Sequence, residues 1–329
     1  MQTVLKTQDF IFFTFTFIKY NAVIFIIIIF VYFMKILIKI LYLISKMPLK
    51  ILYVFSDLFF YINYYFIGYR KKVITENLVN SFPQKSVKEI AEIRKKFYRN
   101  FFDYLAETVK SFTMSQTEGR VRMQHINQHH FHDAKAEGKN IILMAGHIFN
   151  WEWMNALSGV VPQNHSHPVY RKVNSSFWEN EMKKVRNNFG NEAIEAKEVI
   201  MKIFRTPNDG DSIFLFVADQ TPHVAHVNYG LEFLNQRTPA FIGYDKLATR
   251  LDMAVIYCEM KKVKRGYYQI NYHRIYPDGE KFVENEVVRK FHKLLENTIN
   301  KYPDNYLWSH RKWKYQSAIK NFDTVKTNL

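Results

Sequence analysis

The sequence has almost no cysteine. Cys258 is the only one among 329 residues, and it stands in the apolar stretch AVIYCEM. A single thiol excludes an internal disulfide and a zinc site built from cysteines, and it fits a reducing compartment. We therefore expect Cys258 to be a small core residue.

Other signatures are missing as well. The sequence contains no internal repeat, no low-complexity segment and no glycine-rich phosphate-binding loop. Nucleotide-binding sites commonly need such a loop, because its backbone N–H groups hold the phosphates. We expect neither a metal nor an organic cofactor.

Acidic residues are fewer than basic ones. The chain has 46 Lys and Arg against 30 Asp and Glu, which gives a formal net charge of +16. This excess favours an acidic partner such as phospholipid headgroups, a phosphorylated substrate or nucleic acid. A nucleic-acid-binding protein would need basic residues gathered on one face or a known binding signature. The sequence shows neither, so we expect no nucleic-acid partner.

The N-terminal part contains the longest apolar run. Between Phe10 and Met34 it is interrupted only by Lys19, Asn21 and two threonines. With its flanks it reaches the roughly 20 residues needed to cross a bilayer, and no small-residue cleavage site follows it. We predict that residues 1–46 form a transmembrane or membrane-anchoring segment.

Basic residues gather on the C-terminal side of this run, which predicts that the rest of the chain is cytoplasmic. They are Lys35, Lys39, Lys46, Lys50, Arg70, Lys71 and Lys72, against Lys6 and Lys19 before the run. A second aromatic stretch, residues 51–72, contains Asp57 and Asn63 and has a basic end. That composition favours an interfacial helix or hairpin at headgroup level over a second span.

Residues 47–315 show the pattern of an α/β domain. The spacing of apolar residues predicts a helix over 86–112, with Ser86 as its N-cap. Short apolar runs such as 140–145 and 212–217 predict buried strands, and they alternate with helical segments, one of them over 192–206. This alternation predicts a mostly parallel central sheet flanked by helices, in αβα layers. We expect residues 316–329 to be a tail.

Three histidines are followed five positions later by an acid. The pairs are His132 with Glu137, His147 with Glu152, and His273 with Asp278. The composition predicts about one such pair by chance, so spacing alone does not identify a site. Glu137 and His132 fall on different faces of a predicted helix, and Asp278 begins a turn after Pro277.

His147 stands apart because it follows a predicted buried strand. In α/β sheets, sites form at the carboxyl ends of the strands. A carboxylate from Glu152 would there fix the ring tautomer, so that the other ring nitrogen takes a proton from a bound hydroxyl. A partly exposed histidine at a strand end, without a catalytic role, is the alternative.

Five segments of the sequence, taken in order, resemble those of a known protein family. They are GYRKKVITENLVNSFPQKS from Gly68, GHIFNWEW from Gly146, VYRKVN from Val169, VADQT from Val217 and YLWSHRKWK from Tyr306. In this order they resemble the lipid A biosynthesis acyltransferases, the late lauroyl and myristoyl transferases. That family is part of the glycerolipid acyltransferase group with an H-x4-D/E motif.

The resemblance covers roughly residues 46–315 and leaves out the first 33, so that Met34 is an alternative start. It implies an αβα acyltransferase fold. It also implies acyl transfer from acyl carrier protein, or from coenzyme A, to a hydroxyl of a phosphorylated glycolipid at the cytoplasmic face of a bacterial inner membrane. His147 would be the general base and Glu152 its orienting acid, without a covalent acyl-enzyme.

The resemblance also supplies candidates for substrate binding. Arg186 matches a functional arginine of the family, and Asp219 would bind substrate or hold that arginine. Arg171 and Lys172 would meet a phosphate, because cations form strong charge-assisted bonds with it. Asn150, Gln220 and Arg311, within the shared segments, complete the set. The ordinary alternatives are a solvated helix residue for Arg186, a cap for Asp219 and a surface pair for Arg171 and Lys172.

Two other functions remain open at this point. The first is the same acyl transfer onto another lyso-lipid or glycolipid. The second is a non-catalytic, membrane-anchored binding protein.

Overall fold

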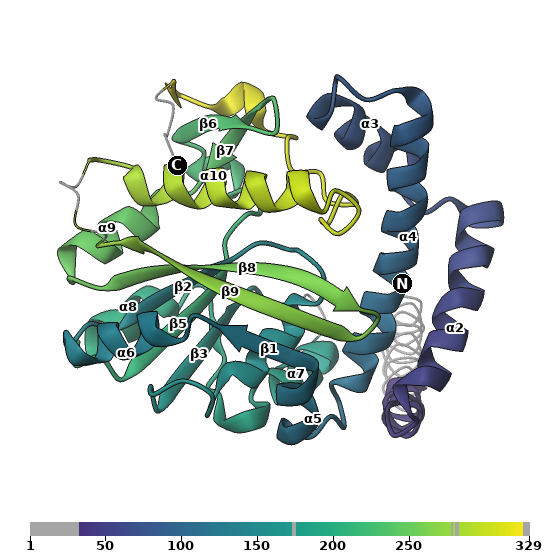
Figure 1. Ribbon diagram of the computed structural model, residues 1–329, viewed down its shortest axis with the longest axis horizontal. Helices are drawn as coiled ribbons and strands as arrows, with labels where there is room; N and C mark the ends of the chain where they lie inside the picture. The colour runs from purple at the N-terminus through teal and green to yellow at the C-terminus, as the bar shows by residue number, and fades with distance from the viewer. Residues whose placement is uncertain (1–32, 173–175, 278, 280–282, 325–329) are drawn as a thin grey trace, which may run out of the picture.

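A seven-stranded sheet forms the centre of the protein (Figure 1), which is represented by a computed structural model that describes residues 33–172, 176–277, 279 and 283–324. The strand order is β1-β9-β8-β2-β5-β3-β4, and every neighbouring pair is parallel except β8 with β9. The strands are β1 Met123–Ile126, β2 Ile141–Ala145, β3 His165–Tyr170, β4 Ile194–Glu195, β5 Ser212–Val217, β8 Ala254–Lys264 and β9 Tyr267–Tyr276. The predicted mostly parallel sheet is therefore confirmed.

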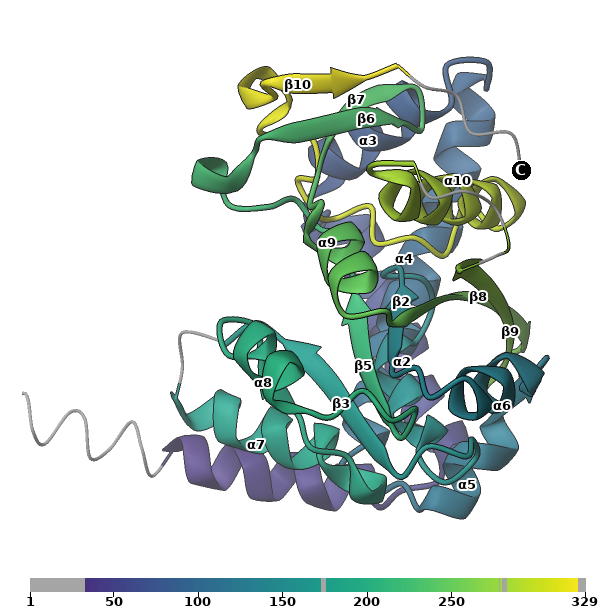
Figure 2. The ribbon, with the colours of Figure 1, turned by 90° about the vertical axis from the view of Figure 1, so that its left-hand side faces the viewer.

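Helices cover both faces of this sheet. Figure 2 shows α6 (His129–Ala136) and α8 (Val199–Arg205) on opposite sides of the strands. With both faces covered, the central strand β2 is buried at every position, which explains why its sequence is a continuous apolar run and does not alternate. Cys258 on β8 is buried too, as expected. The remaining helices of the domain are α5 Gln116–Arg122, α7 Ser176–Arg186, α9 Gly243–Arg250 and α10 Glu286–Lys301.

The chain from 192 to 206 differs from the predicted single helix. Residues Ile194–Glu195 form β4, and helix α8 begins only at Val199. The Val169–Ile194 register places β4 at the edge of the sheet, and the amide of Ala196 donates to the carbonyl of Tyr170. Pairing with β3 thus outweighs the local helical periodicity.

A second, three-stranded sheet was not predicted. It contains β6 Tyr229–Phe233, β7 Gln236–Ala240 and β10 Asn321–Asp323, in the order β10-β6-β7. Residues 321–323 were expected to belong to a tail, and they pair in parallel with β6 instead. The carboxylate of Asp323 accepts hydrogen bonds from Tyr229 Oη and Arg289 Nη1 at 2.6 and 2.8 Å. These side-chain contacts from distant segments hold a short polar strand that shows no periodicity of its own.

The N-terminal helices pack beside the sheet domain (Figure 1). Residues 33–45 are helical, followed by α2 (Leu49–Ile62), a π-helical turn (Asn63–Ile67) and α3 (Lys71–Ser81). Helix α4 (Val87–Lys110) has the predicted N-cap, because Ser86 and Glu89 form a capping box. The capping box satisfies backbone N–H groups that would otherwise lack partners at the start of the helix.

The predicted transmembrane run lies almost entirely outside the described residues. Within the described part of the chain, no single helix is long and apolar enough to cross a membrane. One bent pair, Leu49–Ile67 with Lys71–Ser81 at 92°, passes the same test of length and composition together. Many apolar side chains between residues 33 and 69 are exposed, namely Phe33, Ile36, Ile40, Tyr42, Leu43, Met47, Ile51, Val54, Phe55, Leu58, Phe59, Tyr61, Ile62, Tyr65, Phe66, Ile67 and Tyr69.

Candidate active site

His147 and Asp219 lie side by side at the carboxyl end of the central sheet. Strands β2 and β5 pair in parallel with Ala145 opposite Val217, so that each of the two polar residues comes two positions after a paired strand end. His147 Nδ1 is 2.6 Å from Asp219 Oδ1, and the His147 amide donates to the same oxygen at 3.0 Å. Both residues are buried.

This pairing sets the tautomer of His147. An ionised carboxylate only accepts hydrogen bonds, so that Nδ1 carries the hydrogen and Nε2 of the neutral ring keeps its lone pair. The side-chain Nε2 of Gln220 lies 2.9 Å from His147 Nε2, where its amide donates to that lone pair. Asp219 and Gln220 therefore engage both nitrogens of the ring.

Asp219 has two further partners that the sequence analysis missed. The hydroxyl of Tyr306 donates to its carboxylate, and Lys312 Nζ donates to its backbone carbonyl. Burial by itself would raise the pKa of Asp219. The attraction and hydrogen bond of His147, joined by Lys312 and Tyr306, outweigh burial and lower that pKa, so the carboxyl stays ionised.

The cation that reaches this site is Lys312 and not the predicted Arg311. Lys312 is 2% exposed, whereas Arg311 is exposed and does not line the cavity described below. Burial lowers the pKa of Lys312 to about 8, although Asp219 acts in the opposite direction. Both cations lie in the segment YLWSHRKWK, and only the course of the backbone decides which of the two points inward.

Glu152 forms an ion pair with Arg186. Glu152 Oε1 lies 3.1 Å from Arg186 Nη2, and the guanidinium stacks over Tyr170 at 5.1 Å. The expectation that Glu152 orients His147 is not met, because Asp219 occupies Nδ1 and the described residues show no hydrogen bond between Glu152 and His147. The alternative that Asp219 holds the arginine is likewise not met, because Arg186 pairs with Glu152. A 3₁₀ helix that begins at Trp151 brings that ring against His147 at 4.8 Å and leaves Glu152 for Arg186.

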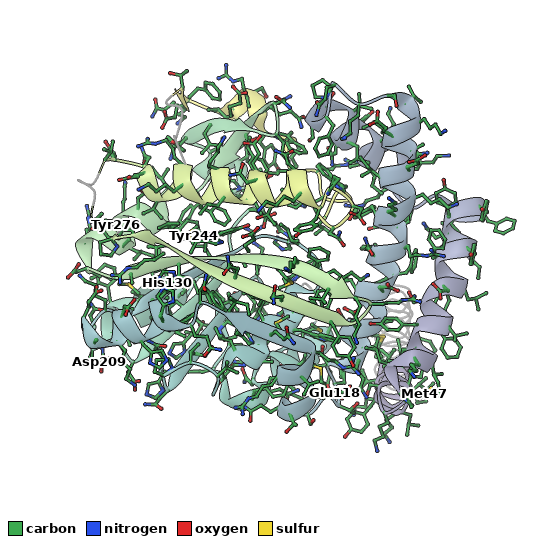
Figure 3. The ribbon with its side chains drawn as sticks, in the orientation of Figure 1. Met47, Glu118, His130, Asp209, Tyr244 and Tyr276 are labelled. Atoms are coloured by element: carbon green, nitrogen blue, oxygen red, sulfur yellow. The ribbon has the colours of Figure 1, made fainter. Side chains whose placement is uncertain are left out.

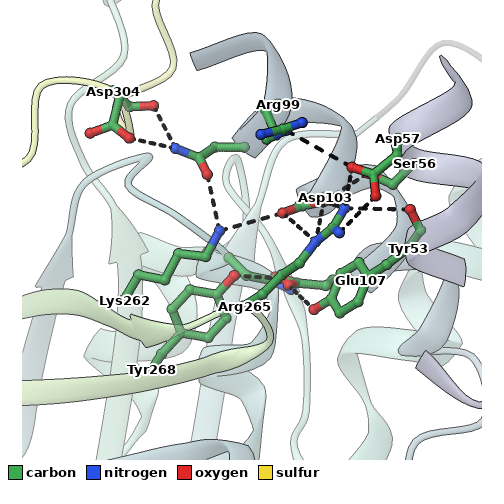
Figure 4. Close-up of polar contacts among 12 residues, drawn as sticks. Tyr53, Ser56, Asp57, Arg99, Asp103, Glu107, Lys262, Arg265, Tyr268 and Asp304 are labelled. Atoms are coloured by element: carbon green, nitrogen blue, oxygen red, sulfur yellow. Dashed lines mark hydrogen bonds and ion pairs between the residues drawn. The ribbon is translucent and has the colours of Figure 1, made fainter. Parts of the chain in front are cut away.

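Asn150 lies behind the site and is fully buried. Its Nδ2 donates to Glu107 Oε2 at 2.8 Å, and its Oδ1 accepts from the amide of Trp153 at 3.3 Å. Its predicted contact with substrate is therefore replaced by a structural role. Glu107 also accepts from Tyr53 Oη and Tyr268 Oη at 2.6 and 2.7 Å (Figure 4).

Glu107 thus ties three parts of the fold together. Tyr53 comes from α2, Tyr268 from β9 and Asn150 from the loop after His147. Burial raises the pKa of Glu107, and the three hydrogen bonds act in the opposite direction. An anion without three donors would be costly at such a position. This network fixes the loop that carries Trp151 and Glu152.

A cavity of about 750 Å³ opens beside His147. Its polar lining includes His147, Glu152, Arg171, Arg186 and Gln220. Its apolar lining includes Val169, Leu215, Phe216, Phe241, Tyr244 and Leu247, with Tyr244 labelled in Figure 3. Lys172 is exposed and is not part of the lining. The cavity therefore places His147 in a lining that combines charged and polar groups with many apolar side chains.

The two other histidine–acid pairs differ from this site. His132 and Glu137 are both exposed, and Glu137 forms an ion pair with Arg274. His273 bonds Glu259 at 2.9 Å, and Asp278 lies outside the described residues. Among the described residues, His129, His130 and Asp133 on α6 lie close enough to share a cation (His130 in Figure 3), and all three are outside the cavity.

The chemistry of the site follows from His147. A neutral imidazole in the wall of a cavity can take a proton at Nε2 from a bound hydroxyl, and a buried carboxylate at Nδ1 stabilises the imidazolium that forms. This arrangement suits attack of a hydroxyl on an acyl group.

A comparison with known protein families agrees with acyl-transfer chemistry at this site. The family model of the bacterial lipid A biosynthesis acyltransferases matches residues 26–315. The chain belongs to this family. It is therefore an acyltransferase of lipid A biosynthesis. The match begins upstream of Met34, so the resemblance extends further toward the N-terminus than the sequence analysis indicated. None of the curated proteins gives a significant match to this acyltransferase.

Proposed function

We propose that this acyltransferase moves a fatty acyl chain from acyl carrier protein to a hydroxyl of a phosphorylated lipid A precursor, with His147 as the general base. The observation that carries the proposal is the His147–Asp219 pair at a cavity with many apolar lining residues. The pair supplies the base, and the cavity offers space for an acyl chain.

The proposed reaction needs no covalent acyl-enzyme. His147 Nε2 takes the proton of the acceptor hydroxyl while its oxygen attacks the carbonyl carbon of the thioester. The carbon–sulfur bond then breaks, and the thiolate leaves with the proton from the imidazolium. Asp219 stabilises the imidazolium in between, because its carboxylate remains ionised beside it. The products are an ester and a free thiol.

Glu152 and Arg186 have a separate role in this proposal. Their ion pair lines the cavity next to His147, and it presents the guanidinium in a fixed position. A guanidinium held in that way can bind a phosphate or a carbonyl oxygen of a substrate. Arg171, which also lines the cavity, and Lys172, exposed next to it, would meet the acceptor's phosphate.

The charge of the protein and its exposed apolar side chains favour binding to acidic partners and to lipids. The net charge of +16 would attract both an acidic carrier protein and a phosphorylated lipid. Many apolar side chains between residues 33 and 69 are exposed. Exposed apolar side chains gathered in one region are typical of a surface that binds a membrane or another protein. We propose that this region docks on the cytoplasmic face of the bacterial inner membrane, where the acceptor lipid is dissolved.

The acceptor is tested by comparing lipids from cells with and without the protein. We expect lipid A to become lighter by the mass of one acyl chain when the protein is deleted. Expression of the wild-type protein should restore the mass, and the His147→Ala variant should not. Unchanged lipid A together with another lipid that lacks an ester would favour a different lyso-lipid or glycolipid as acceptor.

A further inference from the structure

Gln220 covers the ring nitrogen of His147 that would receive the substrate's proton. Its side-chain Nε2 is 2.9 Å from His147 Nε2, while Asp219 Oδ1 is 2.6 Å from Nδ1. A nitrogen lone pair accepts one strong hydrogen bond at a time. A hydroxyl, or a water molecule, therefore meets His147 Nε2 only after the amide of Gln220 has moved.

The backbone around Gln220 is held while its side chain is exposed. On one side, the carbonyl of Asp219 accepts a hydrogen bond from Lys312 Nζ. On the other, the hydroxyl of Thr221 donates to the carbonyl of Lys312. The side chain of Gln220 is exposed at the cavity and makes no other hydrogen bond to the residues that the structure describes. Its amide can rotate away without moving the strand end.

We infer that Gln220 is a specificity-determining residue that keeps water from His147 until the acceptor lipid binds. This inference rests on the proposed acyl transfer. Water in the place of the acceptor hydroxyl would give hydrolysis. His147 Nε2 would take a proton from water, whose oxygen attacks the thioester carbonyl. The carbon–sulfur bond would break, and a carboxylic acid and a thiol would result.

Water and the acceptor lipid differ in the number of contacts that they make when they displace the amide of Gln220 from His147. A water molecule offers only the one hydrogen bond that the amide already makes. An acceptor lipid makes further contacts along the cavity, and these hold its hydroxyl next to His147 at a high effective concentration. When the acceptor saturates the cavity, these contacts offset the cost of displacing the amide, whereas water has no such contacts. The amide of Gln220 therefore slows hydrolysis more than it slows transfer.

The test compares acceptor-independent thiol release with ester formation, using the purified full-length protein and an acyl thioester of acyl carrier protein. Gln220→Ala removes the amide, and Gln220→Asn shortens the side chain by one methylene, so that its amide falls short of His147. At saturating acceptor, we expect the ratio of hydrolysis to transfer to rise about fivefold in both variants, the change expected from the loss of one hydrogen bond that competes with water.

Two controls locate the effect. Gln124→Ala removes an exposed glutamine on β1, outside the cavity, and should leave the ratio as in the wild type. Adding His147→Ala to Gln220→Ala should abolish the extra thiol release, since that release depends on the same base.

Three results would contradict the inference. An unchanged ratio in both variants, with normal ester formation by the wild type, overturns it and leaves the proposed function intact. A parallel loss of hydrolysis and transfer overturns it as well, because Gln220 then binds substrate. A wild-type protein that forms neither ester nor thiol contradicts the proposed function itself.

Discussion

Glu152 contacts Arg186 and not His147, although Glu152 and His147 share the H-x4-E motif. The ion pair measures 3.1 Å between Glu152 Oε1 and Arg186 Nη2. The acid that contacts the imidazole is Asp219, 72 residues later in the sequence. The two acids therefore act on different partners within one cavity, and their roles are separable by substitution.

Substitution of Asp219 should affect the chemical step most. Asp219→Asn keeps the shape but removes the charge that fixes the tautomer and stabilises the imidazolium. We expect kcat for acyl transfer to fall by about 10³ to 10⁴, with a much smaller change in KM. An Asp219→Asn variant with near wild-type kcat would exclude Asp219 as the partner of the base.

Substitution of the base itself should have the largest effect. The His147→Ala variant, assayed in isolated membranes, should abolish acyl transfer while its expression and folding remain intact.

The Glu152–Arg186 pair should show energetic coupling. Both side chains are mostly buried, with 10% and 16% exposure, so removal of one leaves the other charge poorly compensated. A double-mutant cycle of Glu152→Gln and Arg186→Gln, followed by urea unfolding, should give a coupling free energy of about 1–3 kcal/mol. The exposed pair Lys72 and Glu76 on α3 is a control that should give close to zero. Equal coupling in both cycles would argue against the buried pair.

Removal of Glu107 should lower the free energy of unfolding and loosen the loop that carries Trp151 and Glu152. Glu107→Leu leaves the hydroxyls of Tyr53 and Tyr268 and the amide of Asn150 without their acceptor. Each buried donor left without a partner costs about 1–3 kcal/mol of the free energy of unfolding. Tyr268→Phe removes one donor only and should cost about 1 kcal/mol.

The matched control for Glu107 is Glu92→Leu, an exposed position on the same helix. It should leave both stability and kcat close to the wild-type values. If Glu107→Leu unfolds at the same urea concentration as Glu92→Leu, the network of Figure 4 does not stabilise the fold.

The histidines His125 and His292 should each lower the free energy of unfolding on acidification from pH 6.5. Burial lowers the pKa of His125 to about 4 and that of His292 to about 3. The unfolded chain binds a proton on each histidine near pH 6.5, whereas the folded chain does not. The part of the free energy of unfolding that depends on these histidines is therefore largest above pH 6.5 and decreases as the pH falls. Each histidine contributes a slope of up to about 1.4 kcal/mol per pH unit between pH 6.5 and 4.

Urea unfolding at several pH values between 4.5 and 7.5 measures this slope. His292→Gln should reduce it by about one histidine's share, and the exposed His132→Gln should leave it unchanged. Equal slopes in the wild type and His292→Gln would show that His292 is not the protonated group.

Much of the fold follows from local sequence patterns. The capping box at Ser86, the continuous apolar run of β2 and the alternation of strands with helices were sufficient to predict α4 and the mostly parallel sheet. They were also sufficient to place His147 at a strand end. Such patterns depend on neighbours in sequence, and strong periodicity survives in the folded state. The segment of β4 has a helical periodicity that pairing with β3 overrides, and β10 has no periodicity of its own and becomes a strand only by pairing with β6.

The sequence by itself determined that His147 follows a buried strand and that acids and cations occur in the segments shared with the family. Only the tertiary structure decided which acid contacts which cation or ring. The pairing of β2 with β5, with Ala145 opposite Val217, brings Asp219 to His147, while the 3₁₀ turn from Trp151 leaves Glu152 for Arg186. Hydrogen bonds act over about 3 Å in space, and spacing in the sequence fixes such distances only within one helix or strand.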